Sequence, residues 1–190
     1  MSELGRSVFS AVEFLTEFHR DVSRLVVTVE EQMTNEGLAP LYGGTAFWNR
    51  SITYNSPTSW MPRWVARLYS LKADNSSKGE EKAPWFVFFN VYFTPKHIGE
   101  PVAAWGFGKQ KSKQRLGPPI ERLLIANDGP DFLRAIPAED WMTVDEMPDR
   151  LSDFEYQARA VVELCDAQTV DEIVVVPLVA QVARLGKSRR

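Results

Sequence analysis

The chain has 190 residues, and its 22 Lys and Arg against 25 Asp and Glu leave a formal net charge of −3. This balance argues against a protein whose whole surface binds nucleic acid, because such domains are usually clearly basic. The only cysteine, Cys165, excludes an internal disulfide and a multi-cysteine metal site, and it is typical of a reducing compartment.

Sorting signals and length lead to two further expectations. The N-terminal segment carries Glu3 and no uninterrupted apolar core, so it does not resemble a secretory signal. The longest near-apolar stretch, 173–180, is far shorter than the roughly 20 residues of a membrane span. We therefore expect a cytoplasmic protein without a membrane segment. Because typical domains contain about 100 to 200 residues, we also expect a single domain over residues 1–190.

A long amphipathic helix is expected over residues 8–35. Its apolar residues recur at alternating steps of three and four, which places them on one side of a helix: Val8, Ala11, Leu15, Phe18, Val22, Leu25 and Val29. Ser10 and Glu13 have the spacing of a capping box, and Gly37 is a typical helix stop. At its usual rise per residue this helix would be about 40 Å long, enough to cross a whole sheet.

Between residues 38 and 127 the apolar residues recur at every second position, and β-branched and aromatic residues become frequent. We expect strands at 45–54, 63–71, 85–94, 102–109 and 120–126. The connections are too short for parallel crossovers, so neighbouring strands should be antiparallel. The strand 85–94 is apolar on both sides and should lie in the middle of the sheet, covered on both faces.

A first C-terminal helix is predicted over residues 152–166. Ser152 and Glu155 have capping-box spacing at its start. The apolar residues that follow recur at helical steps and include Phe154, Ala158, Val161 and Cys165. In such a helix Cys165 would lie in the apolar stripe, where a cysteine behaves as a small hydrophobic residue.

The segment 170–185 allows two interpretations. Thr169 and Glu172 form another capping box, but the segment also contains β-branched residues and Pro177. We favour a kinked helix over a short strand followed by a helix, and we expect the basic tail 186–190 to be frayed. The predicted fold is therefore α+β: a long N-terminal helix, an antiparallel meander of about five strands, and C-terminal helices packed on the sheet.

Candidate catalytic and metal-binding residues are few. His19 and His97 lie on different predicted elements, and neither has a partner at the spacing of a metal site. Both fit ordinary surface positions better than the role of a general base. We therefore predict no catalytic residue, no metal site and no cofactor.

Three polar residues interrupt apolar strand faces and suggest a site for a small anion. They are Arg67, Asn90 and Arg122. If the strand register brought them together, two guanidinium groups and an amide would bind an anion such as a phosphate or a carboxylate. The competing interpretation is that each arginine reaches solvent at a sheet edge and lays only its stem on apolar neighbours.

The first helix is the candidate surface for a protein partner or for a second copy of the chain. Its apolar stripe is wider than a simple pair of packed helices needs, and the predicted interface residues are Phe9, Phe14, Phe18 and Val26. The competing interpretation places the helix between the sheet and the C-terminal helices, where the whole stripe would be core.

These observations lead to a ranking of functions. We expect a non-enzymatic cytoplasmic interaction or accessory protein, because the usual catalytic combinations are missing and the long helix offers a surface to a partner. The alternatives are a small-molecule or anion-binding module that uses a sheet face, and an enzyme without a local motif. Nucleic acid is disfavoured as a partner, since the basic cluster at 109–115 fits a solvated hairpin end.

Overall fold

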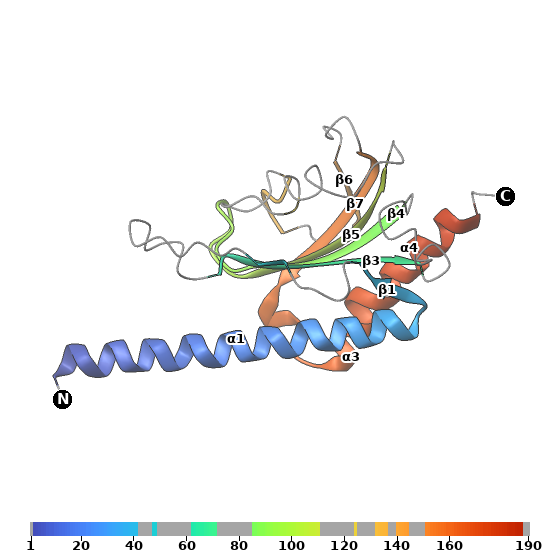
Figure 1. The fold of residues 1–190 in the computed structure, drawn as a ribbon. Helices are drawn as coiled ribbons and strands as arrows, with labels where there is room; N and C mark the ends of the chain where they lie inside the picture. The colour runs from blue at the N-terminus through green and yellow to red at the C-terminus, as the bar shows by residue number, and fades with distance from the viewer. Residues whose placement is uncertain are drawn as a thin grey trace.

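The structure is a computed structural model that describes residues 2–41, 47–48, 62–71, 85–110, 124, 132–136, 140–144 and 151–187. Its elements in chain order are α1 Glu3–Asn35, β1 Leu38–Pro40, β2 Phe47–Trp48, β3 Trp64–Leu71, β4 Trp85–Tyr92, β5 Val102–Gln110, β6 Met142–Thr143, β7 Leu151–Ala160, η3 Val161–Glu163, α3 Ala167–Val170, η4 Asp171–Val175 and α4 Val176–Lys187. A long helix, one sheet and C-terminal helices confirm the α+β class (Figure 1).

Within the described residues the sheet has seven strands, all paired in the antiparallel sense. Its order is β1-β3-β4-β5-β7-β6, and β2 pairs with β3 beside this path. Strand β4 lies between β3 and β5, and its residues 86–92 are buried, so the prediction of a covered central strand is confirmed. The strand predicted at 120–126 lies outside the described residues except for Leu124, which is buried.

The two faces of the sheet have different covers. Val87, Phe89 and Val91 of β4 belong to a core cluster that also contains residues of α1, η4 and α4. Figure 1 shows these helices on the same side of the sheet. Phe86 and Phe88 point to the other face, where a second cluster is formed with residues of β7 and of the segments before it. The sheet is therefore the middle layer, and α1 packs on only one of its faces.

Helix α1 begins earlier than the sequence pattern predicted. The side chain of Ser2 accepts a hydrogen bond from the amide of Gly5 at 3.1 Å and caps the helix, so the helix starts at Glu3 and not near Ser10. The predicted end is confirmed, because Gly37 follows the helix with φ of 85°, a conformation that favours glycine. The helix thus has 33 residues, and only its part from Val22 to Met33 contains buried side chains.

The prediction of a helix over 152–166 is wrong, because residues 151–160 form strand β7 between β5 and β6. Phe154, Tyr156 and Ala158 are buried at every second position, which is the spacing of a strand face. The backbone of β7 is paired with β5 along most of its length. The apolar residues of this segment fit both helical and strand spacing, and pairing with β5 favours the strand. Cys165 then lies beyond the strand and is exposed, not in a buried helical stripe.

The C-terminal segment is helical from Ala167 to Lys187, which confirms the helical interpretation over a strand. Its cap is Asp166, which accepts a hydrogen bond from the amide of Thr169 at 2.8 Å. This bond lowers the pKa of the Asp166 carboxyl. A π-helical turn over Asp171–Val175 interrupts the helix just before Pro177, the residue that cannot donate a backbone hydrogen bond.

Candidate functional site

The first half of α1 extends past the sheet, whereas the second half lies against it (Figure 1). All the buried residues of the helix lie between Val22 and Met33. We call residues 3–18 the arm. Five of the nine large hydrophobic residues that are exposed in the described part of the chain belong to it: Leu4 75%, Val8 55%, Phe9 56%, Val12 56% and Phe14 68%. The arm is therefore a helix that presents apolar side chains to solvent.

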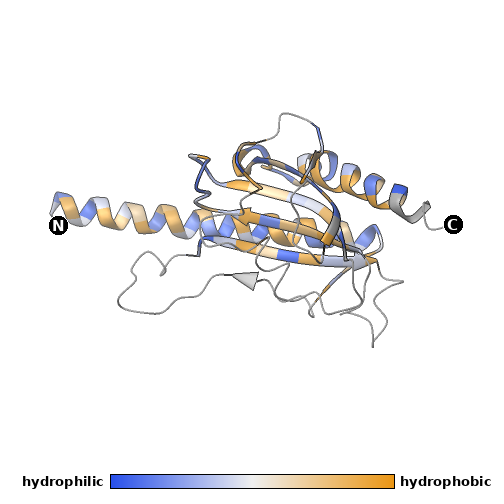
Figure 2. Ribbon diagram, turned by 90° about the horizontal axis from the view of Figure 1, so that it is seen from above, coloured by the Kyte–Doolittle hydropathy of each residue, from blue (hydrophilic) through white to orange (hydrophobic). Residues whose placement is uncertain are grey.

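The apolar residues of the arm form one regular line, which we call the seam. Leu4, Val8, Ala11, Leu15 and Phe18 follow one another at alternating steps of four and three, and Val22, Leu25 and Val29 continue the same steps on the sheet. Figure 2 shows that hydrophobic positions recur along α1 as far as its N-terminal end. The seam that packs on the sheet thus continues on the same side of the helix into the arm, where the described residues leave Leu4 and Val8 exposed.

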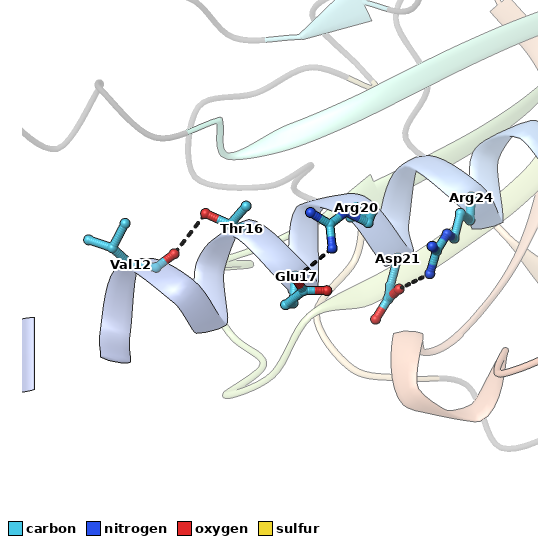
Figure 3. Close-up of polar contacts among 6 residues, drawn as sticks. All are labelled: Val12, Thr16, Glu17, Arg20, Asp21 and Arg24. Carbon is cyan, nitrogen blue, oxygen red and sulfur yellow. Dashed lines mark hydrogen bonds and ion pairs between the residues drawn. The ribbon is translucent and has the colours of Figure 1, made fainter. Parts of the chain in front are cut away.

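Polar side chains around Glu17 make their hydrogen bonds and ion pairs within the helix itself, as Figure 3 shows. The guanidinium of Arg20 donates to the carboxylate of Glu17, and the hydroxyl of Thr16 donates to the carbonyl of Val12 at 2.8 Å. Both side chains of the Glu17–Arg20 pair are more than half exposed, so the pair contributes little to stability. Among the described residues of the arm, apolar side chains such as Leu4, Val8 and Val12 are more than half exposed.

A groove of about 810 Å³ opens where the arm leaves the sheet. Phe14, Leu15 and Phe18 line it from α1, and Phe93 and Lys96 line it from the loop that follows β4. The ring of Phe93 lies edge-on to that of Phe18, with centroids 5.7 Å apart, and Phe18 stacks on Phe14 at 6.3 Å. This aromatic contact joins the base of the arm to the body of the protein. The groove is therefore lined mainly by apolar side chains, with His19, Arg63 and Lys96 as its basic residues.

The predicted interface residues fall into two environments. Phe9 and Phe14 are exposed, Phe18 is half-buried at the groove, and Val26 is buried against the sheet as part of the core. The sequence prediction did not include Leu4 or Val12 among interface residues, although both are exposed on the arm. Leu4 continues the four-and-three spacing upstream of Val8, and recognising Ser2 as the helix cap would have brought it into the pattern.

The residues predicted to bind an anion are not brought together. In the strand register Arg67 pairs with Phe89 and Asn90 pairs with Ala66, so the side chains of Arg67 and Asn90 lie on opposite faces of the sheet. Arg122 lies outside the described residues. A joint site for an anion at Arg67 and Asn90 therefore has no support in the geometry.

Arg67 instead faces α1. Its guanidinium forms an ion pair with the carboxylate of Glu30, and its side chain is 5% exposed. Tyr69 lies beside it on the same strand, and burial raises the pKa of the Tyr69 hydroxyl to about 12, an effect that the neighbouring guanidinium opposes. These charged and polar groups join the second half of α1 to the sheet.

Asn90 belongs to a buried network on the opposite face. Its amide donates to the hydroxyl of Tyr92 at 2.8 Å, and that hydroxyl donates to the carbonyl of Leu124 at 2.8 Å. Burial raises the pKa of Tyr92 well above its usual range. This network joins the carbonyl of Leu124 to the central strand and satisfies polar groups inside the core.

The two histidines lie apart. His19 packs edge-on against Phe93, with centroids 5.1 Å apart, and His97 is exposed in the loop after β4. Among the residues that the structure describes, no three His, Cys, Asp or Glu side chains gather where they could hold a metal ion. The helices in the same residues contain no segment with the length and apolar character of a membrane span.

The arm, its seam and the groove at its base thus form one largely apolar surface among the described residues. Comparison with models of known protein families, with curated proteins and with solved structures gives no match.

Proposed function

We propose that this chain is a non-enzymatic interaction or accessory protein, and that the seam of the arm is its partner-binding surface. The observation that carries this proposal is the continuation of the core seam onto an exposed stretch of the same helix. On the seam Leu4 is 75% exposed and Val8 is 55% exposed, while Val22, Leu25 and Val29 further along it are core.

Burial of such an apolar surface against a partner is favourable in free energy. Burial of apolar surface is favourable by roughly 25 cal/mol per Å², so a helix with large aliphatic and aromatic side chains in water gains free energy when a partner covers them. Contiguous apolar surface on a folded protein typically marks a site of association. Single exposed hydrophobic residues are common, but here five occur within three turns of one helix.

A second candidate function is the binding of a small apolar molecule in the groove. It is favoured by the groove's size, about 810 Å³, which lies within the range of about 300 to 1,000 Å³ that small-molecule sites occupy. Native mass spectrometry of the purified protein tests this candidate, because a bound molecule adds its own mass to that of the chain.

Photo-crosslinking in the cell tests the leading proposal. The photoreactive residue p-benzoylphenylalanine replaces Val8 on the seam in one variant and Glu13 on the outer side of the arm in the matched control. We expect a crosslinked protein adduct of defined mass from position 8 and none from position 13. If position 8 yields no adduct, or if both positions yield the same adducts, the seam is not the partner-binding surface.

A further inference from the structure

We infer that the partner of the arm is a second copy of this chain, and that two arms pair side by side in antiparallel orientation, each with its N-terminal end in the other's groove. This inference rests on the proposed function and names the partner of the same site.

The spacing of the seam is that of a coiled coil. Steps of four and three repeat every seven residues, and two helices with this repeat bury their seams against each other along their length. The charged residues of the arm all fall at outer positions of this repeat, away from the seam: Glu3, Arg6, Glu13 and Glu17. Pairing along the seam therefore removes no charge from water, and the partner need not supply countercharges to the flanks.

The body of the protein determines the direction of pairing. From Val22 onward the seam is covered by the sheet, with Val22 and Val29 3% and 0% exposed. A second helix lying parallel on the arm's seam would run into the space that this sheet occupies. An antiparallel helix runs the other way and ends at the groove, so its own body lies beyond the far end of the arm.

The antiparallel pairing is complementary in size. A register that places Val8 opposite Ala11 of the second copy also places Leu4 opposite Leu15, which lines the groove. The residues that flank the seam then match large to small, because Val12 faces Gly5 and Phe14 faces Ser7 of the other copy. Alternation of bulky and small side chains across a contact is what close packing of two helices requires.

A membrane surface is the competing cover for an amphipathic helix. Helices that lie on membranes are typically rich in Lys and Arg on their polar side. The arm's outer side instead carries three acidic residues, Glu3, Glu13 and Glu17, against one basic residue, Arg6. The charge pattern thus favours a protein cover, and it has no feature that would attract an anionic lipid surface.

Sedimentation equilibrium of the full chain gives the first test. We expect the wild type to sediment at twice its monomer mass of 21.6 kDa. Val8→Glu should raise the dissociation constant of the dimer at least tenfold, while Ser10→Glu, on the outer side of the same helix, should leave it unchanged. Circular dichroism of both variants should match that of the wild type, since Val8 and Ser10 are both exposed.

Disulfide crosslinking tests the direction and the register. In a Cys165→Ser background, Val8→Cys and Ala11→Cys are prepared separately, oxidised alone and oxidised after mixing. We expect crosslinked dimer mainly from the mixture, because only there do two cysteines face each other. Efficient crosslinking of Val8→Cys by itself would indicate parallel pairing and overturn the arrangement.

Three outcomes overturn the inference in different ways. A wild type that stays monomeric while position 8 still photo-crosslinks to a different protein overturns self-association and leaves the proposed function intact. A monomer that binds phosphatidylcholine–phosphatidylserine vesicles through Val8 identifies a lipid surface as the cover. A monomer with neither vesicle binding nor an adduct at position 8 overturns the inference and the proposed function together.

Discussion

The two halves of α1 carry the same pattern of apolar residues and have opposite environments. Val8 and Val29 occupy equivalent places on the seam, three heptads apart, yet Val8 is 55% exposed and Val29 is 0% exposed. The difference arises because the helix is longer than the part of the sheet that it crosses (Figure 1). A periodic apolar pattern thus specifies which side of a helix will be covered, but not which surface will cover it.

In the second half of α1 the seam is buried by the sheet of the same chain. Val22, Leu25, Val29 and Met33 pack into one core cluster with strands β3, β4 and β5, and the Glu30–Arg67 ion pair lies at the edge of the same contact. The seam residues Leu4 and Val8 of the arm are exposed instead of packed against these strands. Three measurements on variants of the chain test whether the two halves differ in energy as they do in burial.

The largest effect is expected from one substitution made at equivalent places in both halves. Val29→Asp puts an unpaired charge into the core and should lower the free energy of unfolding by about 3 to 5 kcal/mol. Val8→Asp, in water on the arm, should change it by less than about 0.5 kcal/mol. Urea unfolding at a protein concentration low enough to avoid association gives both values, and similar losses for the two variants would contradict the comparison.

An intermediate effect is expected from two ion pairs on the same helix. Glu30→Gln removes the carboxylate that faces the buried guanidinium of Arg67, and this should destabilise the fold by about 1 to 3 kcal/mol. Glu17→Gln removes the exposed partner of Arg20 and should cost less than about 1 kcal/mol. Thermal unfolding of the two variants measures the difference. Equal shifts in Tm would mean that burial of the Arg67 pair does not strengthen it.

The smallest effect is expected in the pH dependence of the free energy of unfolding. It arises from Tyr69, on the sheet face that the second half of α1 covers. Tyr69 has a pKa of about 12 in the folded chain and about 10 when unfolded, so the folded state holds its proton more tightly. The stability from this group is complete below pH 10 and is lost as pH rises from about 10 to 12. Tyr69→Phe should make the alkaline loss shallower by on the order of 1 kcal/mol at pH 11. Urea unfolding along a pH series checks this.

The control for that series is Tyr92→Phe, on the opposite face of the sheet. Burial raises the pKa of Tyr92 in the same direction, so its loss should also make the alkaline slope shallower. Identical slopes for the wild type and Tyr69→Phe would show that Tyr69 does not titrate with unfolding.

The sequence predicted the elements whose pattern has only one physical solution. Strand β4 is apolar at both odd and even positions and is short and rich in aromatic and β-branched residues, a combination that favours a central strand covered on both faces. The four-and-three spacing of α1 likewise fits only a helix, and Gly37 marks its end through a backbone angle that other residues rarely adopt. In these places local and tertiary preferences agree.

The prediction failed where one segment satisfied two patterns. Residues 151–160 have capping-box spacing and helical apolar steps, but Phe154, Tyr156 and Ala158 also alternate as a strand does. Pairing with β5, which is remote in sequence, decided the outcome. The joint site of Arg67 and Asn90 failed for a related reason, since a shift of one residue in register moves a side chain to the other face.

The continuity of α1 also determines how the arm acquires its helical form. An isolated helix must first close a hydrogen-bonded turn, an unfavourable step with an equilibrium factor on the order of 0.001, whereas each later residue adds one bond. The half packed on the sheet supplies that first turn, so the arm only extends an existing helix by about four turns. Hydrogen bonds near Ser2 should therefore open before those near Phe18, in a gradual manner as temperature rises. A partner held along the seam would remove that gradient.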